Sequence, residues 1–312
     1  MARDLRELSK LRDSLSYLYF EKAVIERDQN AIVVMRGDER IPVPVSSLTV
    51  LMLGPGTSIT HAAVRVICDS GCTVLWCGEH AMRFYGFGLG ETRKAAQLMK
   101  QARLFSSPDA HLEVARRMYL LRFPEKLQGA MSIRQLRGLE GVRVRESYKL
   151  YSKMYGIPWN KRNYNRNDWN QADVINIALS SANAALYGLC HAAIVSLGYS
   201  PGLGFIHTGK QLSFVYDIAD LYKLETSVPA AFEAASKPSD DIGRSARVIM
   251  RRLLREKKVL KRIPDDLAFL FDIKTDEDVN MDEAGDLWDE EGTVAGGINY
   301  SEDAKTDDDI DL

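Results

Sequence analysis

"MRFYGFGLG", residues 82 to 90, separates two stretches of the chain that have different sequence patterns. Residues 15 to 87, which reach into this stretch, contain short runs of β-branched and aromatic residues, such as "CTVLWC" at 72–77, divided by turn residues. Such runs predict β-strands. One helix, from about Ile59 to Asp69, is expected among them. We expect the glycines of "GFGLG", residues 86–90, to form a hinge, after which the chain becomes helical.

The second stretch carries start and stop signals of long helices. Ser107-Pro108 combines a capping residue with proline at the first helical position. Ser132 and Gln135 have the spacing of a capping box, and Gly156 suits the end of the same helix. Another long helix is expected from about Asp173 to Gly198. The pattern predicts an α+β fold with a small N-terminal β-sheet domain and a larger all-helical domain.

The charge of the chain is distributed unevenly. Residues 275–312 carry 15 acidic residues and one lysine, a net charge of −14. The whole chain has 41 basic and 43 acidic residues, so residues 1–274 carry a net charge of +12. We therefore predict a β-rich domain over residues 1–88, a helical domain over 89–274 and a disordered acidic tail over 275–312.

A basic body predicts a polyanionic partner, most often nucleic acid. Two clusters support this. "WNKRNYNRNDW", residues 159–169, interleaves aromatic and basic residues suited to stacking on bases and pairing with phosphates. "RRLLREKKVLKR", residues 251–262, predicts a strongly basic helix. The acidic tail has two equally supported interpretations beyond a solubilising role: it masks the basic surface, or it docks as an acidic peptide on a partner.

The remaining composition predicts a cytoplasmic protein. No signal peptide is recognised, and no apolar run is expected to approach the roughly 18 residues that span a membrane. Cys68, Cys72, Cys77 and Cys190 lack the paired spacing of a zinc site, so we expect free thiols.

Two aspartates stand three residues apart in "GFIHTGKQLSFVYDIADLYK", residues 204–223. Acids at this spacing usually lie on a solvated helix face. Here Asp217 and Asp220 share a stripe with Phe214, where an ionised carboxylate needs a cation or hydrogen-bond donors to replace water. Oxygen ligands suit a hard divalent ion such as Mg²⁺ or Mn²⁺. His207 is a candidate nitrogen ligand or proton-transfer group.

Glu140 is a candidate third ligand in "RQLRGLEGVRVRESYKLY", residues 134–151. The ordinary interpretation is a salt-bridged exposed helix. Gly138 and Gly141 oppose it, because each mid-helix glycine costs about 1 kcal/mol relative to alanine, which suggests that something approaches the backbone closely. Arg137 and Arg143 are placed to contact phosphate oxygens. Glutamate, histidine and aspartate beside arginines predict metal-assisted phosphodiester chemistry.

The motifs "PGT…THAAVR", "LRG-EG-RVR", "YG-PWN" and "GF-HTGK-LSFVYDIADL" stand in this order over roughly residues 10 to 275. Together they resemble CRISPR-associated protein 1, the adaptation integrase, in its type I-E form. The resemblance implies catalytic residues Glu140, His207, Asp217 and Asp220, with Glu140, His207 and Asp220 holding Mg²⁺ or Mn²⁺. It also implies a homodimer, two of which clamp a dimer of CRISPR-associated protein 2 in a heterohexamer.

The implied reaction inserts short duplex prespacers into the CRISPR array, as a terminal 3′-hydroxyl attacks a repeat-border phosphodiester. The resemblance places DNA contacts at Arg65, Arg83, Arg162, Lys210, Tyr164 and Tyr187. It also places an aromatic wedge where this chain has Lys22, for which Tyr19 or Phe20 could substitute. Two alternatives stay open: a metal-dependent nuclease that cuts branched DNA without integration, and a non-catalytic DNA scaffold.

Overall fold

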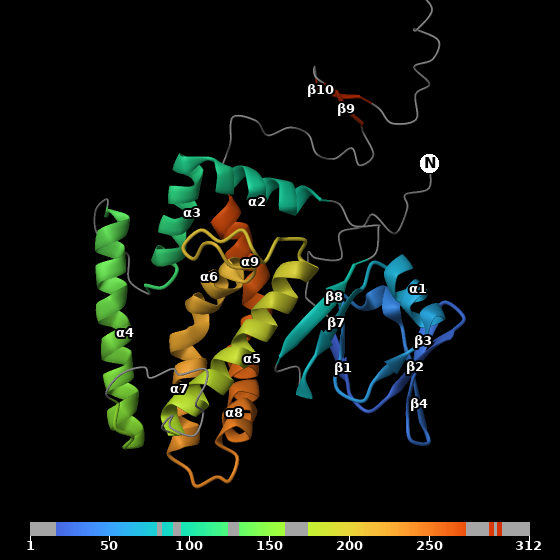
Figure 1. Ribbon diagram of the computed structural model, residues 1–312, viewed down its shortest axis with the longest axis horizontal. Coiled ribbons are helices and arrows are strands. Elements are labelled where there is room, and N and C mark those ends of the chain that lie inside the picture. Colours follow the sequence, from blue (N-terminus) through green and yellow to red (C-terminus); the bar gives the residue numbers. More distant parts are fainter. Residues whose placement is uncertain are drawn as a thin grey trace, which may run out of the picture. The chain divides into compact units, whose positions relative to one another are not determined.

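The computed structural model describes residues 17–79, 83–89, 95–123, 131–159 and 174–272, together with the short strands 287–289 and 292–294. The chain divides into two compact units, Met1–Ile273 and Lys274–Leu312. The first unit begins with β-strands and continues with helices (Figure 1), so the predicted α+β fold is confirmed. The division into separate domains at residue 88 stays a prediction.

Two four-stranded sheets form the N-terminal region. One has the order β1 (Tyr17–Phe20), β5 (Val50–Leu53), β7 (Thr73–Cys77) and β8 (Phe84–Gly88). The other has the order β4 (Glu39–Val43), β3 (Ala31–Arg36), β2 (Val24–Asp28) and β6 (Ser58–Ile59). Helix α1 (His61–Asp69) lies beside these strands (Figure 1) and is capped by Thr60, whose side chain accepts a hydrogen bond from the Ala63 N–H. The predicted start at Ile59 was too early, because Ile59 pairs with β2.

Strand β5 joins the β-region to the helices because both of its faces are buried. Val50 and Met52 belong to the core shared with the helices, whereas Leu51 and Leu53 belong to the core beneath α1. A continuous apolar run is typical of such a two-sided strand. The glycine hinge was wrong for residues 86 to 88: they lie in β8 and pair with β7, Gly88 opposite Val74.

The helices are α2 (Ala96–Ser106), α3 (Pro108–Leu120), α4 (Ile133–Tyr155), α5 (Val174–Ser196), α6 (Ser213–Tyr222), α7 (Ser227–Ala235), α8 (Ile242–Glu256) and α9 (Val259–Phe271). The predicted caps are confirmed: Ser107 caps α3, and Ser132 and Gln135 form the capping box of α4. Gly156 ends α4 with φ 68°, in the left-handed region. The prediction of a single helix over residues 251–262 was wrong. Helix α8 ends at Glu256, and α9 begins after Lys258, whose φ is 51°.

Helix α5 is the centre of the helical part. It contacts α6, α7, α8 and α9 and also β7 and β8 (Figure 1). The expectation that no apolar run reaches membrane-spanning length was wrong, because α5 is long and apolar enough by length and composition. Of its apolar window, 61% is buried inside the protein, as in a core helix of a globular protein.

The second unit is described only at β9 (Leu287–Asp289) and β10 (Gly292–Val294), which pair in an antiparallel hairpin. The rest of the predicted acidic tail lies outside the described residues.

Candidate functional site

Asp217 is completely buried on α6, and its carboxylate organises the preceding loop. Oδ2 accepts hydrogen bonds from the backbone N–H groups of Phe205 at 2.6 Å and Ile206 at 3.0 Å. Oδ1 accepts from the backbone N–H of His207 at 2.9 Å and lies 2.7 Å from the His207 Nδ1. Donors therefore replace the water that this carboxylate loses on burial. Its role is to position the loop, because both oxygens are already engaged.

The same contact sets the chemistry of His207. In the neutral imidazole, an Nδ1 that donates its hydrogen to Asp217 leaves the lone pair on Nε2. The His207 side chain is 44% exposed, and its contact with Asp217 uses Nδ1 and leaves Nε2 for a ligand. A histidine whose second nitrogen binds a carboxylate is the usual arrangement of metal-binding histidines.

Gly204 allows the loop to fold this tightly. A Cβ at this position would lie 2.3 Å from the His207 carbonyl oxygen and 2.8 Å from Ser213. The loop then turns through Gly209, with φ 78°, and the Ser213 hydroxyl at the start of α6 accepts a hydrogen bond from the Lys210 N–H at 3.0 Å. Only glycine fits at Gly204 without displacing the backbone that carries His207.

Asp220 lies one turn after Asp217 and is paired with a cation of the chain itself. The Lys223 Nζ is 2.5 Å from the Asp220 Oδ1 and 5.0 Å from the centre of the Tyr187 ring. Burial tends to lower the pKa of Lys223, but Asp220 and Tyr187 outweigh this and raise it. Sequence reasoning missed Lys223, although the three-residue spacing from Asp220 was visible.

Aromatic rings connect the two aspartate environments. The Tyr216 ring lies edge-on to His207, with 5.9 Å between ring centres, and edge-on to Tyr187 at 5.0 Å. Tyr187 is half-buried among these side chains. Its predicted contact with DNA stays a prediction.

Glu140 lies on α4 with a side chain that is only 13% exposed. Arg143 NH1 donates to its Oε2 at 3.1 Å, and Arg122 NH1 lies 3.6 Å from its Oε1. Arg122 is buried over the Tyr119 ring, and its Nε and NH2 have no hydrogen-bond partner in the described part of the chain. Sequence reasoning missed Arg122, since nothing in its local sequence indicates its partner on α4.

The pKa of Tyr119 is influenced by charged groups on both α4 and α6. Burial is the main cause that raises the pKa of Tyr119; Arg122 and Arg137 lower it, whereas Glu140 and Asp217 raise it further. The carboxylates of α4 and α6 thus act on the same phenol.

The proposed metal ligands fit a hard divalent ion in their chemistry: two carboxylates and one histidine with an accessible Nε2. Within residues 17–272 as far as they are described, no three His, Cys, Asp or Glu side chains form a group with metal-holding spacing. Instead, the cations of Arg143 and Lys223 stand beside the Glu140 and Asp220 carboxylates. Each carboxylate therefore already has a cationic partner within the chain, and metal binding there stays a prediction.

The predicted DNA-contacting residues fall into three groups. Arg65, Arg83, Arg137 and Lys210 are exposed, and Arg65 forms a loose ion pair with Asp69 at 3.8 Å. Arg143 instead pairs with Glu140. Arg162 and Tyr164 lie outside the described residues. The DNA-binding roles of all these residues stay predictions.

Two further expectations concern aromatic side chains. Trp159, expected to stack on bases, packs inside against Tyr148, with 4.6 Å between ring centres, and against Phe232 at 6.0 Å. Tyr19 and Phe20 pack against the cores around the β-strands. All three rings are partly buried, so base stacking by Trp159 and a wedge at Tyr19 or Phe20 stay predictions.

Gly138 and Gly141 have open space around them. A Cβ at either position would meet nothing within 4 Å. No described part of the chain requires glycine there, so close approach of an external ligand to α4 stays a prediction.

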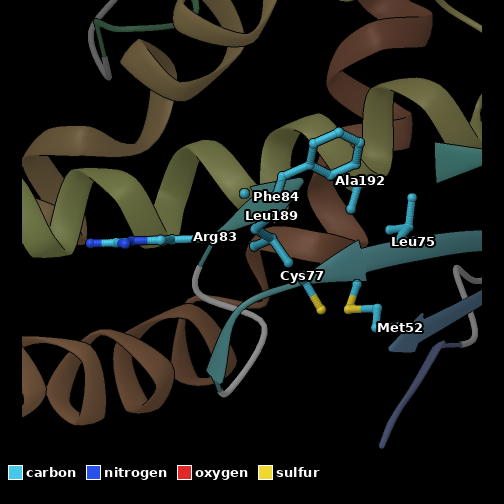
Figure 2. A pocket seen from close by; sticks show the side chains of 8 residues that line it. Met52, Leu75, Cys77, Arg83, Phe84, Leu189 and Ala192 are labelled. Carbon is cyan, nitrogen blue, oxygen red and sulfur yellow. The ribbon is translucent and has the colours of Figure 1, made fainter. Parts of the chain in front are cut away.

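A small cavity of about 20 Å³ lies between the sheet and α5. Figure 2 shows its apolar lining, with Met52, Leu75 and Cys77 from the sheet and Ala192 from α5, while the Arg83 guanidinium points away from these residues. It has room for about one water molecule, so it is a packing gap rather than a substrate site.

All four cysteines are free thiols, as expected. Burial raises the pKa of Cys77 to about 12, and burial raises the pKa of Cys190 as well. Neither thiol has the character of a nucleophile.

Comparison with known proteins identifies the family. Residues 16–123 and 118–236 match the family model described as CRISPR associated protein Cas1. The chain is 51% identical to the CRISPR-associated endonuclease Cas1 2 of Thermus thermophilus over 308 residues, 97% of this chain and 95% of the relative. It is 41% identical to the CRISPR-associated endonuclease Cas1 of Escherichia coli over 254 residues, 81% of this chain and 83% of the relative.

Solved structures agree. A crystal structure of a TtCas1–DNA complex superposes with a TM-score of 0.77 at 52% identity, covering 85% of this chain and 99% of that chain. A casposase bound to an integration product, at 17% identity and a TM-score of 0.56, shares the fold. With family-model matches that together extend over residues 16–236 and relatives this similar across most of the sequence, the chain belongs to the CRISPR-associated protein Cas1 family.

Proposed function

We propose that this protein is a divalent-metal-dependent DNA endonuclease and integrase of CRISPR adaptation, of the type I-E subtype. The observation that carries the proposal is the His207–Asp217 pair: a buried carboxylate with four hydrogen-bonding contacts presents an accessible imidazole Nε2. The names of the relatives and the DNA in the TtCas1 complex support a nuclease that acts on DNA. The motifs quoted above support the subtype.

Each residue has a distinct role in the proposed reaction. Glu140, His207 through Nε2, and Asp220 hold Mg²⁺ or Mn²⁺. When bound, the cation stabilises the negative charge that develops on the phosphate. Asp217 does not bind the metal but orients His207. Arg143 and the buried Arg122 supply positive charge beside Glu140, which suits a phosphodiester of the substrate.

The reaction is a transesterification. A bond forms between the attacking 3′-oxygen and the phosphorus as the bond from phosphorus to the leaving 3′-oxygen breaks. The attacking hydroxyl loses its proton, and the leaving oxygen gains one. The protein contributes mainly orientation and fixed positive charge, which are the large terms in phosphoryl transfer.

The proposed setting is a cytoplasmic heterohexamer, in which two homodimers of this chain hold one dimer of CRISPR-associated protein 2. The net positive charge of residues 1–274 supports binding to the prespacer and repeat DNA. DNA contacts at Arg65, Arg83, Arg137, Arg162, Lys210, Tyr164 and Tyr187 belong to this proposal.

The test is a strand-transfer assay on a supercoiled repeat plasmid with Mg²⁺ or Mn²⁺, with and without CRISPR-associated protein 2. We expect Glu140→Gln to abolish strand transfer and retain DNA binding. Glu146→Gln is the matched control, since Glu146 is an exposed acid on the same helix and pairs only with Lys149 in the described residues. Nicking of branched DNA without strand transfer would support the nuclease alternative, and full activity of Glu140→Gln would remove Glu140 from the site.

A further inference from the structure

Gln101 is a completely buried polar side chain on α2, and all its observed partners are backbone groups of the loop before His207. Its Nε2 donates to the carbonyl oxygens of Ser200 and Leu203, each at 3.0 Å. Its Oε1 accepts from the Ser200 N–H at 2.7 Å. One side chain thus makes three hydrogen bonds to a segment about 100 residues away, without using any polar partner on its own helix.

His111 on α3 contacts the same loop further along. Its Nε2 lies 3.0 Å from the Phe205 carbonyl oxygen, and its Nδ1 lies 3.1 Å from the Phe105 carbonyl oxygen. The imidazole is packed between the rings of Phe105 and Phe205, with ring centres 5.3 and 5.0 Å away. His111 therefore lies between the end of α2 and the loop, and as a neutral imidazole it donates to one of these two carbonyl oxygens at a time.

The peptide unit between Phe205 and Ile206 is bound on both sides. Its carbonyl oxygen contacts His111, and its N–H donates to the Asp217 Oδ2 at 3.0 Å. Since a peptide unit is planar, fixing its oxygen also fixes the direction of its N–H. The next residue is His207, whose own N–H and Nδ1 both contact Asp217. The orientation of the His207 ring thus depends on contacts from α2 and α3 as well as from α6.

We propose that Gln101 and His111 are positioning residues for the reaction: they hold the Ser200–His207 segment so that His207 presents Nε2 in its working orientation. The proposal rests on the proposed function for its effect on catalysis, but not for its effect on His207 itself. Burying polar side chains is favourable only where their hydrogen bonds are made. A core position that served packing alone is filled equally well by Leu or Met.

The experiment uses the full-length protein and the variants Gln101→Met, His111→Phe and His111→Gln. Gln101→Met keeps the side-chain length and removes every hydrogen bond. His111→Gln keeps one donor at the end of the side chain, so it is the conservative member of its pair. His61→Gln is the matched control, because His61 is an exposed histidine at the start of α1.

Two readouts separate positioning from a general packing role. The first is strand transfer at saturating DNA, with DNA affinity and thermal stability measured in parallel. The second is the ¹⁵N spectrum of the imidazole side chains. The chain has only five histidines, so the His207 signals can be assigned as those that disappear in His207→Ala. In the wild type, His207 is expected as the Nδ1–H tautomer.

We expect kcat to fall about 10- to 100-fold in Gln101→Met and His111→Phe, which is the usual effect of removing a residue that orients a metal ligand. DNA affinity should stay within about twofold of the wild-type value. The His207 signals should move toward a mixture of tautomers, and His111→Gln should recover part of both effects. Folded variants with wild-type kcat and unchanged His207 signals would overturn the proposal. The proposal would also be overturned if the wild-type His207 is the Nε2–H tautomer. This measurement does not depend on whether any variant folds. If the His207 signals move in the variants but the wild type itself shows no strand transfer, the positioning role is upheld and the proposed function is rejected.

Discussion

The Nζ of Lys223 lies 2.5 Å from the Oδ1 of Asp220, so a side-chain cation of the protein stands where a divalent metal is proposed to bind. His207 and Asp217 form the complementary pair, in which the carboxylate is buried and the imidazole is accessible. The two aspartates of α6 therefore have different tasks despite standing three residues apart: Asp217 builds the loop, and Asp220 offers a carboxylate to a cation.

Replacing Lys223 by methionine should tighten metal binding. Lys223→Met removes the competing cation and keeps the long side chain over Tyr187. We expect the dissociation constant for Mn²⁺ to fall about tenfold, which corresponds to about 1.4 kcal/mol, measured by titration calorimetry without DNA. Lys237→Met, at an exposed lysine on the surface, is the control. Unchanged or weaker Mn²⁺ binding in Lys223→Met would show that Lys223 does not compete for Asp220.

Asp217→Asn and His207→Ala should separate loop building from chemistry. The amide of asparagine cannot accept hydrogen bonds on both sides, so its NH₂ group would face backbone donors. Each lost hydrogen bond to a charged group costs about 1.5–3 kcal/mol. We therefore expect Asp217→Asn to lower both the free energy of unfolding and strand transfer, whereas His207→Ala abolishes strand transfer with little loss of stability. Equal stability of both variants in urea denaturation contradicts the loop-building role.

Gly204→Ala should inactivate the protein through the backbone. The new Cβ would lie 2.3 Å from the His207 carbonyl oxygen, so the loop must shift. We expect loss of strand transfer and altered His207 imidazole signals. Gly202→Ala is the control within the same loop, because its Cβ would meet atoms only at 3.8 Å or more. An active Gly204→Ala variant would mean that the loop tolerates movement at His207.

Gly141→Ala tests whether a ligand approaches α4. Alanine fits there without contact and should stabilise the exposed helix by about 1 kcal/mol. If DNA approaches the backbone beside Glu140, the same substitution should weaken DNA binding or strand transfer while raising the melting temperature. Glu146→Ala on the same helix controls for general effects on α4. Greater stability with unchanged DNA binding and activity would leave Gly141 without a functional reason.

His191 should make stability depend on pH. Its side chain is 7% exposed, its Nε2 has no partner in the described residues, and its ring centre lies 3.6 Å from that of Phe84. Burial lowers the pKa of His191 from 6.5 to about 4. Because the unfolded chain takes up a proton first, the stabilisation is present above pH of about 6.5 and is lost as the pH falls toward about 4.

His191→Phe removes this contribution. Relative to its own stability at pH 7.5, the wild type should lose roughly 2.5 kcal/mol more than the variant at pH 4.5. Urea denaturation of both proteins at the two pH values measures the difference, and all other titrating groups are common to both. Parallel losses in the two proteins would show that His191 is not held neutral by the fold.

The caps of α3 and α4 and the change from strands to helices were predictable, because they depend on residues within four positions of one another. Ser132 and Gln135 form their capping box through contacts that the sequence spacing already defines. The helical character of the second stretch and the charged residues of the family motifs could be predicted from the sequence in the same way. Errors occurred where packing overrides local pattern: Gly86 and Gly88 pair in β8, and Lys258 separates two helices whose basic residues looked continuous.

The amino-acid sequence alone predicted that Glu140, His207, Asp217 and Asp220 belong to one site, and this stays a prediction. Only the tertiary structure decided what each one contacts. Arg122 reaches Glu140 from another helix, and Gln101 and His111 reach the His207 loop across about 100 residues. Such partners are brought together by the apolar core to which α2, α3, α4 and α6 all contribute side chains. A buried polar group then takes whichever donor or acceptor that packing leaves within reach. No local spacing records that outcome, because the chain between the partners only has to be long enough to let them meet.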